Sequence, residues 1–128
     1  MYRAVSIKWV GLWLLLSAIA AGVCALRKGL DKEAETYFQA ALKQDPDDLA
    51  SLVNMGQLRY RQGSLEEARK LVARFNKLVE PTPESLWLAL RIERKLGERA
   101  AEASLGTQLR RRFPASREYQ QLQRGEYD

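Results

Sequence analysis

Apolar positions along most of this chain recur every three or four residues, which is the spacing of a helix buried on one side. The clearest stripe consists of Leu65, Ala68, Leu71, Val72 and Phe75. Gly63, just before it, can adopt the left-handed backbone conformation that ends a helix. Ser64 and Glu67 have the spacing of a capping box. Residues 60–75 therefore predict a helix end, a tight turn and the start of a new helix.

The same pattern returns at a fixed interval. Gly29, Gly63 and Gly97 lie 34 residues apart, and the same interval separates Ala34 from Ala68. A period of 34 residues with two helices in each copy is typical of the tetratricopeptide repeat. We therefore predict an all-α solenoid of three helix pairs, with an apolar N-terminal helix and a short C-terminal capping helix. The expected segments are repeats at 15–48, 49–82 and 83–116, and a cap and tail at 117–128.

Turn-forming residues predict the helix ends. The second helix of the first repeat is expected at Asp31–Gln44, and the sequence Asp-Pro-Asp-Asp at 45–48 separates it from the next helix. Thr82 is expected to cap the third repeat with Pro83 at its first helical position, and Ser116 to cap the final helix. The apolar stripe of Asp31–Gln44 is expected to consist of Ala34, Tyr37, Phe38, Ala41 and Leu42.

The N-terminus carries a different signal. Residues 1–16 read as a signal-like or membrane-anchoring segment, because Trp9–Leu26 contains no charge over 18 residues and follows Arg3 and Lys8. Eighteen helical residues rise about 27 Å, which is marginal for crossing a bilayer. In the competing interpretation, residues 17–28 form the first helix of repeat one and pack on it.

Cys24 has two interpretations. It ends an apolar run, as a lipid-bearing cysteine does in bacterial lipoproteins, although Val23 before it is larger than that motif normally accepts. Alternatively it is a small buried residue of the first repeat helix. Because it is the chain's single cysteine, an internal disulfide is excluded.

Composition argues against catalysis and nucleic-acid binding. The chain has no histidine, and no phosphate-binding glycine loop or nucleophile elbow occurs. We therefore expect no enzyme activity, catalytic residue, metal or cofactor. The net charge of +5 comes from 21 basic and 16 acidic residues mixed along helix faces, which favours a solvated helical surface over nucleic-acid binding.

Some stretches are more specific than the repeat itself. Residues 37–46, 75–78 and 84–91, the last reading Glu-Ser-Leu-Trp-Leu-Ala-Leu-Arg, resemble the type IV pilus biogenesis/stability (PilW/PilF) family. Residues 102–119 resemble the C-terminal end of that family, so the resemblance covers its C-terminal half.

The resemblance implies a function and a location. Members of that family are pilotins, outer-membrane lipoproteins on the periplasmic side that help the pilus secretin to reach the outer membrane and assemble. It therefore implies a non-enzymatic scaffold in the cell envelope whose partner is the secretin, with membrane contact through the N-terminal segment. The alternative is a membrane-associated tetratricopeptide-repeat adaptor with another protein partner.

Binding is expected on one side of the solenoid. Stacked repeats of this type curve, and the first helix of each pair lines the concave side. Arginine and aromatic residues are common anchors of protein interfaces, and several cations suit a segment with acidic groups. The partner-binding candidates are Asn54, Gln57, Tyr60, Arg61, Trp87, Arg91, Arg94 and Lys95.

Overall fold

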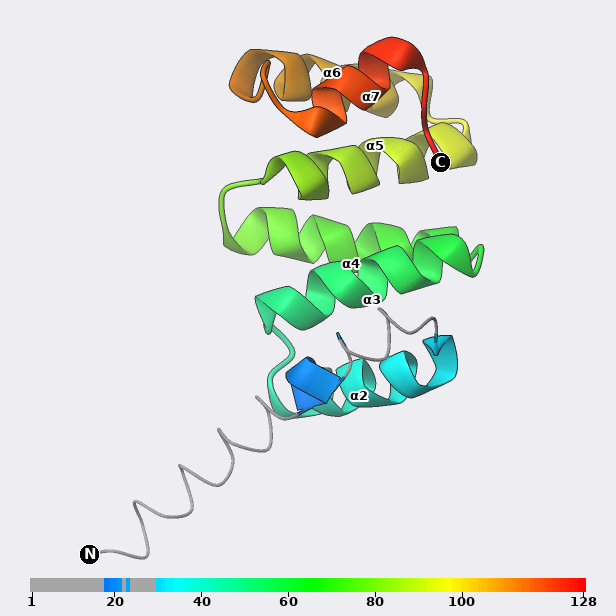
Figure 1. The fold of residues 1–128 in the computed structure, drawn as a ribbon, viewed down its shortest axis with the longest axis vertical. Helices are drawn as coiled ribbons and strands as arrows, with labels where there is room; N and C mark the ends of the chain where they lie inside the picture. The colour runs from blue at the N-terminus through cyan, green and yellow to red at the C-terminus, as the bar shows by residue number, and fades with distance from the viewer. Residues whose placement is uncertain (1–17, 22, 24–29) are drawn as a thin grey trace, which may run out of the picture.

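The computed structural model describes residues 18–21, 23 and 30–128, and this part of the chain contains helices and no strand. Helices stack one above another along the long axis, from α2 at one end to α6 and α7 at the other (Figure 1). Their bounds are α2 Asp31–Gln44, α3 Leu49–Arg61, α4 Leu65–Leu78, α5 Pro83–Leu96, α6 Arg99–Arg112 and α7 Arg117–Arg124. The predicted all-α solenoid of paired helices is confirmed.

The predicted turn residues form most of the expected ends. Gly63 and Gly97 have φ of 81° and 77°, the left-handed conformation that lets one helix end and the next begin. The side chain of Asp48 accepts a hydrogen bond from the Ser51 amide at the start of α3. The Ser116 side chain does the same for the Tyr119 amide at the start of α7. These bonds satisfy amides that a helix leaves free in its first turn.

The predicted capping box at Ser64 and Glu67 is wrong. The Ser64 side chain makes no capping hydrogen bond, and the Glu67 carboxylate lies 2.9 Å from Nε of Arg59 on the preceding helix. A charged partner binds a carboxylate more strongly than a neutral amide does. The structure has a capping box at the start of α5 instead, where Thr82 and Ser85 exchange side-chain and backbone hydrogen bonds.

The stripe predicted for α2 is partly wrong. Ala34, Phe38 and Ala41 are buried, but Tyr37 is 38% exposed. Adjacent helix residues are about 100° apart around the axis, so Tyr37 points away when Phe38 faces α3. Tyr37 therefore belongs to the surface of α2.

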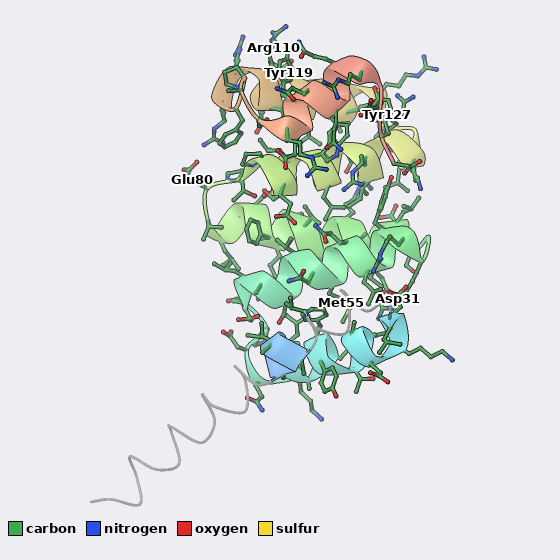
Figure 2. The ribbon with its side chains drawn as sticks, in the orientation of Figure 1. Asp31, Met55, Glu80, Arg110, Tyr119 and Tyr127 are labelled. Atoms are coloured by element: carbon green, nitrogen blue, oxygen red, sulfur yellow. The ribbon has the colours of Figure 1, made fainter. Side chains whose placement is uncertain are left out.

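The buried residues that the structure describes form three core clusters, each between neighbouring helices. Phe38 and Met55 belong to the first, between α2 and α3, and Figure 2 shows Met55 at that junction. Val72 and Leu88 belong to the second, which lies between α4 and α5 and includes Tyr60 of α3. Leu90 and Leu109 belong to the third, between α5 and α6, which α7 also contacts. Each pair of helices thus buries its apolar face against the next, as stacked repeats do.

The N-terminal predictions fall largely outside the described residues. Residues 1–16 and Cys24 lie there, and the proposed first helix of repeat one lies there in part. Among the helices that the structure does describe, none is both long and apolar enough to cross a membrane. The repeat boundaries after residues 48, 82 and 116 stay a prediction, and each lies in a link between two helices.

Candidate protein-binding groove

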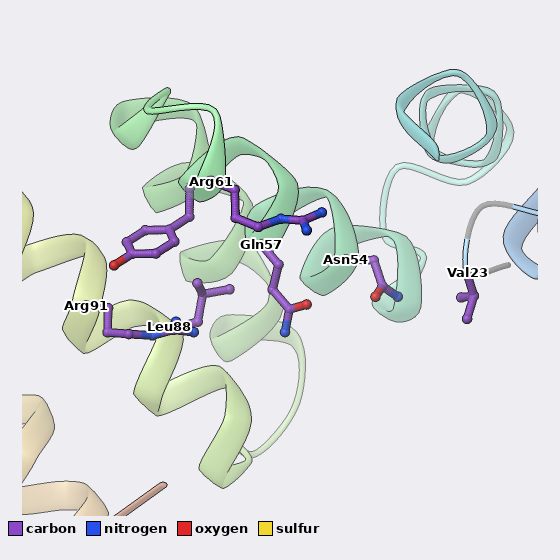
Figure 3. A pocket seen from close by; sticks show the side chains of 7 residues that line it. Val23, Asn54, Gln57, Arg61, Leu88 and Arg91 are labelled. Carbon is purple, nitrogen blue, oxygen red and sulfur yellow. The ribbon is translucent and has the colours of Figure 1, made fainter. Parts of the chain in front are cut away.

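A cavity of about 470 Å³ lies between α3 and α5, the first helices of two consecutive pairs. Asn54, Gln57 and Arg61 reach it from α3 because spacings of three and four residues place them on one helix face. Leu88 and Arg91 reach it from α5 (Figure 3). We call this surface the groove. Its described lining residues are Val23, Asn54, Gln57, Tyr60, Arg61, Leu88 and Arg91.

Burial on the other side of α3 fixes which face is left for the groove. Leu52 and Leu58 are buried in the core. Gly56 faces α4 so closely that a Cβ atom built on it would lie 2.9 Å from Cγ2 of Val72. This close approach holds α3 against α4, and the polar side chains of α3 are therefore turned toward the cavity.

Arg91 is the most unusual group in the groove. Its guanidinium lies 5.0 Å from the ring centre of Tyr60 and 5.6 Å from that of Trp87. Its Nε is buried, and no group of the described residues forms a hydrogen bond with it. Among the described residues, no carboxylate forms an ion pair with it.

Burial lowers the pKa of the Arg91 guanidinium from its ordinary value, because removal from water disfavours the charged form. Arginine nevertheless stays charged at neutral pH. The groove therefore presents a half-buried cation that aromatic rings partly stabilise. An anionic group of a partner would form an ion pair with it.

Tyr60 contacts both the groove and Asp128 of the C-terminal segment. Its side chain is buried, and its hydroxyl donates a hydrogen bond of 3.1 Å to Oδ1 of Asp128. The ammonium of Lys95 lies 4.4 Å from the centre of its ring. Burial raises the pKa of the Tyr60 hydroxyl from its ordinary value, and the bond to Asp128 raises it further.

Polar contacts hold the remaining groove side chains. Nε2 of Gln57 donates a hydrogen bond to the Glu84 carboxylate on α5. Arg61 forms an exposed ion pair of 3.1 Å with Asp31 on α2. Exposed pairs of this kind contribute about 0–1 kcal/mol, so an incoming partner can rearrange them at low cost.

The structure brings some of the predicted site residues together and separates others. Asn54, Gln57, Tyr60, Arg61 and Arg91 line one cavity. Their role in binding a partner stays a prediction.

Trp87 and Arg94 do not line the cavity, and their role in binding a partner also stays a prediction. Trp87 is 5% exposed, and its ring stacks on Tyr127 with 5.7 Å between centroids and 19° between planes. The Arg94 guanidinium lies 3.8 Å from the centre of the Tyr127 ring and 3.0 Å from the Glu102 carboxylate. Both residues therefore lie against the C-terminal segment.

Sequence reasoning missed Leu88, Tyr127 and Asp128. Leu88 lies in a run of apolar residues. In such a run the sequence pattern does not separate residues that line the groove from residues in the core. Tyr127 could have been recognised from the sequence, because an aromatic residue in an otherwise polar tail needs a surface to pack on.

Comparison with known sequences supports the repeat assignment. The family model described as tetratricopeptide repeat matches residues 26–91. The type IV pilus assembly protein PilF of Pseudomonas aeruginosa is 28% identical over 102 residues, which cover 80% of this chain and 40% of that protein. Tetratricopeptide repeat protein 8 of Caenorhabditis elegans is 53% identical over 38 residues, or 30% of this chain and 8% of that one.

Solved structures agree with the sequence comparison. The structure of Pseudomonas aeruginosa PilF superposes with a TM-score of 0.74 at 28% identity, covering 81% of this chain and 47% of that one. The structure of PilW, described as a widely conserved type IV pilus biogenesis factor, has a TM-score of 0.75 at 24% identity and shares the fold; the match covers 85% of this chain and 50% of that one. The chain thus resembles these proteins over most of its own length and spans half or less of theirs.

Proposed function

The chain belongs to the tetratricopeptide-repeat family, and from that premise we propose that it is a non-enzymatic scaffold of type IV pilus biogenesis. Its groove binds a segment of the pilus secretin and helps the secretin to reach or assemble in the outer membrane. The observation that carries this proposal is the similarity to a pilus assembly protein over four-fifths of the chain. Repeats of this family serve protein–protein contacts, which agrees with the assignment of the groove to a protein partner.

The chemistry of the groove supports a peptide segment as the ligand. Polar amides of Asn54 and Gln57 line the same cavity as the Arg91 cation, so backbone and acidic groups of an extended segment both find partners. An acidic side chain near Arg91 would form a charge-assisted hydrogen bond with its guanidinium, which has no ion pair among the described residues. We assign the main anchoring role to Arg91.

The proposal includes a location in the cell envelope, on the periplasmic side of the outer membrane. Residues 1–16 would contact the membrane, and the three repeats would extend from it. This part of the proposal is supported by the pilus-assembly relatives and by the uncharged run of Trp9–Leu26.

Affinity capture from envelope extracts tests this function. The tagged chain is expected to recover the pilus secretin from a piliated host, identified by mass spectrometry. Arg91→Gln should reduce the recovery about tenfold or more, since loss of a charged hydrogen bond in a buried site costs about 1.5–3 kcal/mol. Lys77→Gln is the matched control, because Lys77 is an exposed cation on α4 that does not line the groove.

The helical circular-dichroism signal should be the same in all three proteins. If the native chain recovers another protein and no secretin, the pilus assignment is wrong and the chain is a membrane-associated adaptor for that other partner. If Arg91→Gln and Lys77→Gln recover equal amounts, the groove is not the binding surface.

A further inference from the structure

The residues after α7 turn back onto the body of the molecule. Gly125, with φ of 69°, ends α7 in the left-handed conformation. The following segment, Glu126–Asp128, runs from α7 across α5 (red, Figure 1), and Figure 2 shows Tyr127 at that edge of the stack. The segment has no helical or strand structure, so its position is set mainly by its side-chain contacts.

Two side chains of this segment contact α3 and α5. The Tyr127 ring stacks on Trp87, and Arg94 lies over the same ring at 3.8 Å. The Asp128 carboxylate accepts the hydrogen bond of Tyr60 and lies 3.9 Å from the ammonium of Lys95. An aromatic residue followed by an acidic residue thus meets an aromatic platform surrounded by cations.

These contacts adjoin the groove. Tyr60 lines the cavity and also donates to Asp128, while Arg91 lines the cavity and also lies over the Trp87 ring. The platform under the C-terminal segment is therefore continuous with the surface that we assign to partner binding.

The contacts of Asp128 are weak enough for a partner segment to replace Tyr127–Asp128. Asp128 is 77% exposed, and an exposed pair at 3.9 Å contributes little. The Tyr127–Trp87 stack is the main contact. Simple release of the segment would expose the face of Trp87, whereas replacement by another aromatic side chain would keep that face covered. Displacement by a matching segment is thus favoured over opening.

We propose that Tyr127–Asp128 is an internal ligand of the platform that adjoins the groove, and that the partner segment carries an aromatic residue next to an acidic residue that displaces it. This inference rests on the proposed function in one respect, that the groove binds a protein segment. The partner's aromatic side chain takes the place of Tyr127 on Trp87, and its acidic side chain takes the place of Asp128 beside Tyr60 and Lys95. A second acidic group further along the partner reaches Arg91, which the internal ligand leaves without an ion pair among the described residues.

The internal ligand lowers the apparent affinity for the partner. A tethered segment competes at an effective concentration of about 1 mM. A partner binds only to the fraction of molecules from which the segment is released, so its apparent affinity falls by that fraction. Weakening the internal ligand should therefore strengthen binding in trans.

A peptide in trans tests the proposal with the purified full chain. The probe is a synthetic peptide with the sequence of residues 123–128, Gln-Arg-Gly-Glu-Tyr-Asp. We expect it to bind the Tyr127→Ala/Asp128→Asn variant at least tenfold more tightly than the native chain, by calorimetry and by the shift of the Trp87 indole NH signal in NMR. A peptide with Ala and Asn at its last two positions should bind neither protein.

Glu126→Gln is the matched control, since it removes a neighbouring exposed carboxylate and should leave the peptide affinity of the native chain unchanged. Circular dichroism establishes that the variants are folded. Asp128→Asn alone keeps the Tyr127 stack, so its affinity for the peptide should rise by a smaller factor. This variant replaces the double variant in the test if the double variant fails to fold.

Equal affinity for the native chain and a folded variant would overturn the proposal. Dimers that form at high concentration in the native chain and disappear in the double variant would also contradict it, because the segment would then act between copies. The result is independent of the secretin. A variant that binds the peptide while no secretin is captured refutes only the pilus partner, and capture of secretin without peptide binding refutes only the internal ligand.

Discussion

Tyr60 shows how a single side chain can serve the core, the groove and the chain end together. Its ring is buried with Leu88 and Ile92, and it also lies beside the cations of Arg91 and Lys95. Its hydroxyl reaches Asp128. Because deprotonation would place a negative charge in this partly buried site next to a carboxylate, the folded protein favours the protonated form.

This gives a prediction for alkaline pH. A group whose pKa is raised on folding contributes stability that is fully present below its unfolded pKa, about 10 for tyrosine, and that is lost as pH rises through the folded value. The free energy of unfolding should therefore fall more steeply above pH 10 in the native chain than in Tyr60→Phe. Urea titrations at pH 8 to 11 measure both slopes. Parallel slopes would mean that Tyr60 is not perturbed by folding.

Single residues also show the limit of sequence reasoning about the site. Asn54, Gln57 and Arg61 could be placed together because α3 is a regular helix whose other face is buried. Trp87 could not be placed, because its neighbour Tyr127 comes from a segment with no periodic pattern. Helical spacing predicts which residues share a face, but it does not predict what a non-helical segment covers.

Two glycines lie at contacts between helices, and the space beside them differs. Gly56 lies where α3 touches α4, and a Cβ atom there would be 2.9 Å from Val72. Gly106 lies in α6, where the repeat pattern has larger apolar residues, and Leu122 of α7 comes close to the space above it. A Cβ atom at Gly106 would be 3.5 Å from Leu122, which is ordinary van der Waals contact.

Alanine at these two positions should have opposite effects on stability. In Gly106→Ala the helix gains about 0.5–1 kcal/mol, because alanine loses less backbone freedom than glycine. Gly56→Ala has the same gain, but overpacking against a buried β-branched side chain costs about 1–3 kcal/mol. We expect a net loss of about 1 kcal/mol, measured by chemical denaturation. Equal changes in both variants would show that α3 and α4 are not in close contact at Gly56.

The sequence was sufficient to predict the helices, but it was not sufficient to predict some of the contacts between them. The glycine turns and the caps at Asp48, Thr82 and Ser116 are local, and local residues determine them. The choice of Glu67 between capping Ser64 and pairing with Arg59 depends on a helix that precedes it, so the sequence spacing alone gave the wrong answer.

The whole molecule behaves as a stack in which each helix pair contacts its neighbours. Three core clusters follow one another along the long axis, and no described helix contacts one far along the stack. An elongated stack of this kind has two long sides, one of which carries the groove between α3 and α5. We propose that recognition takes place on this side, with a pilus protein as the partner.

Site-specific photo-cross-linking in the piliated host measures this most directly. A photoreactive residue is placed at Asn54, whose side-chain amide donates a hydrogen bond to the carbonyl of Ala50 in its own helix, or at Lys77, which is exposed on α4. We expect a cross-link from position 54 to the secretin and none from position 77. A secretin cross-link from position 77 alone, or none from either position, would contradict it.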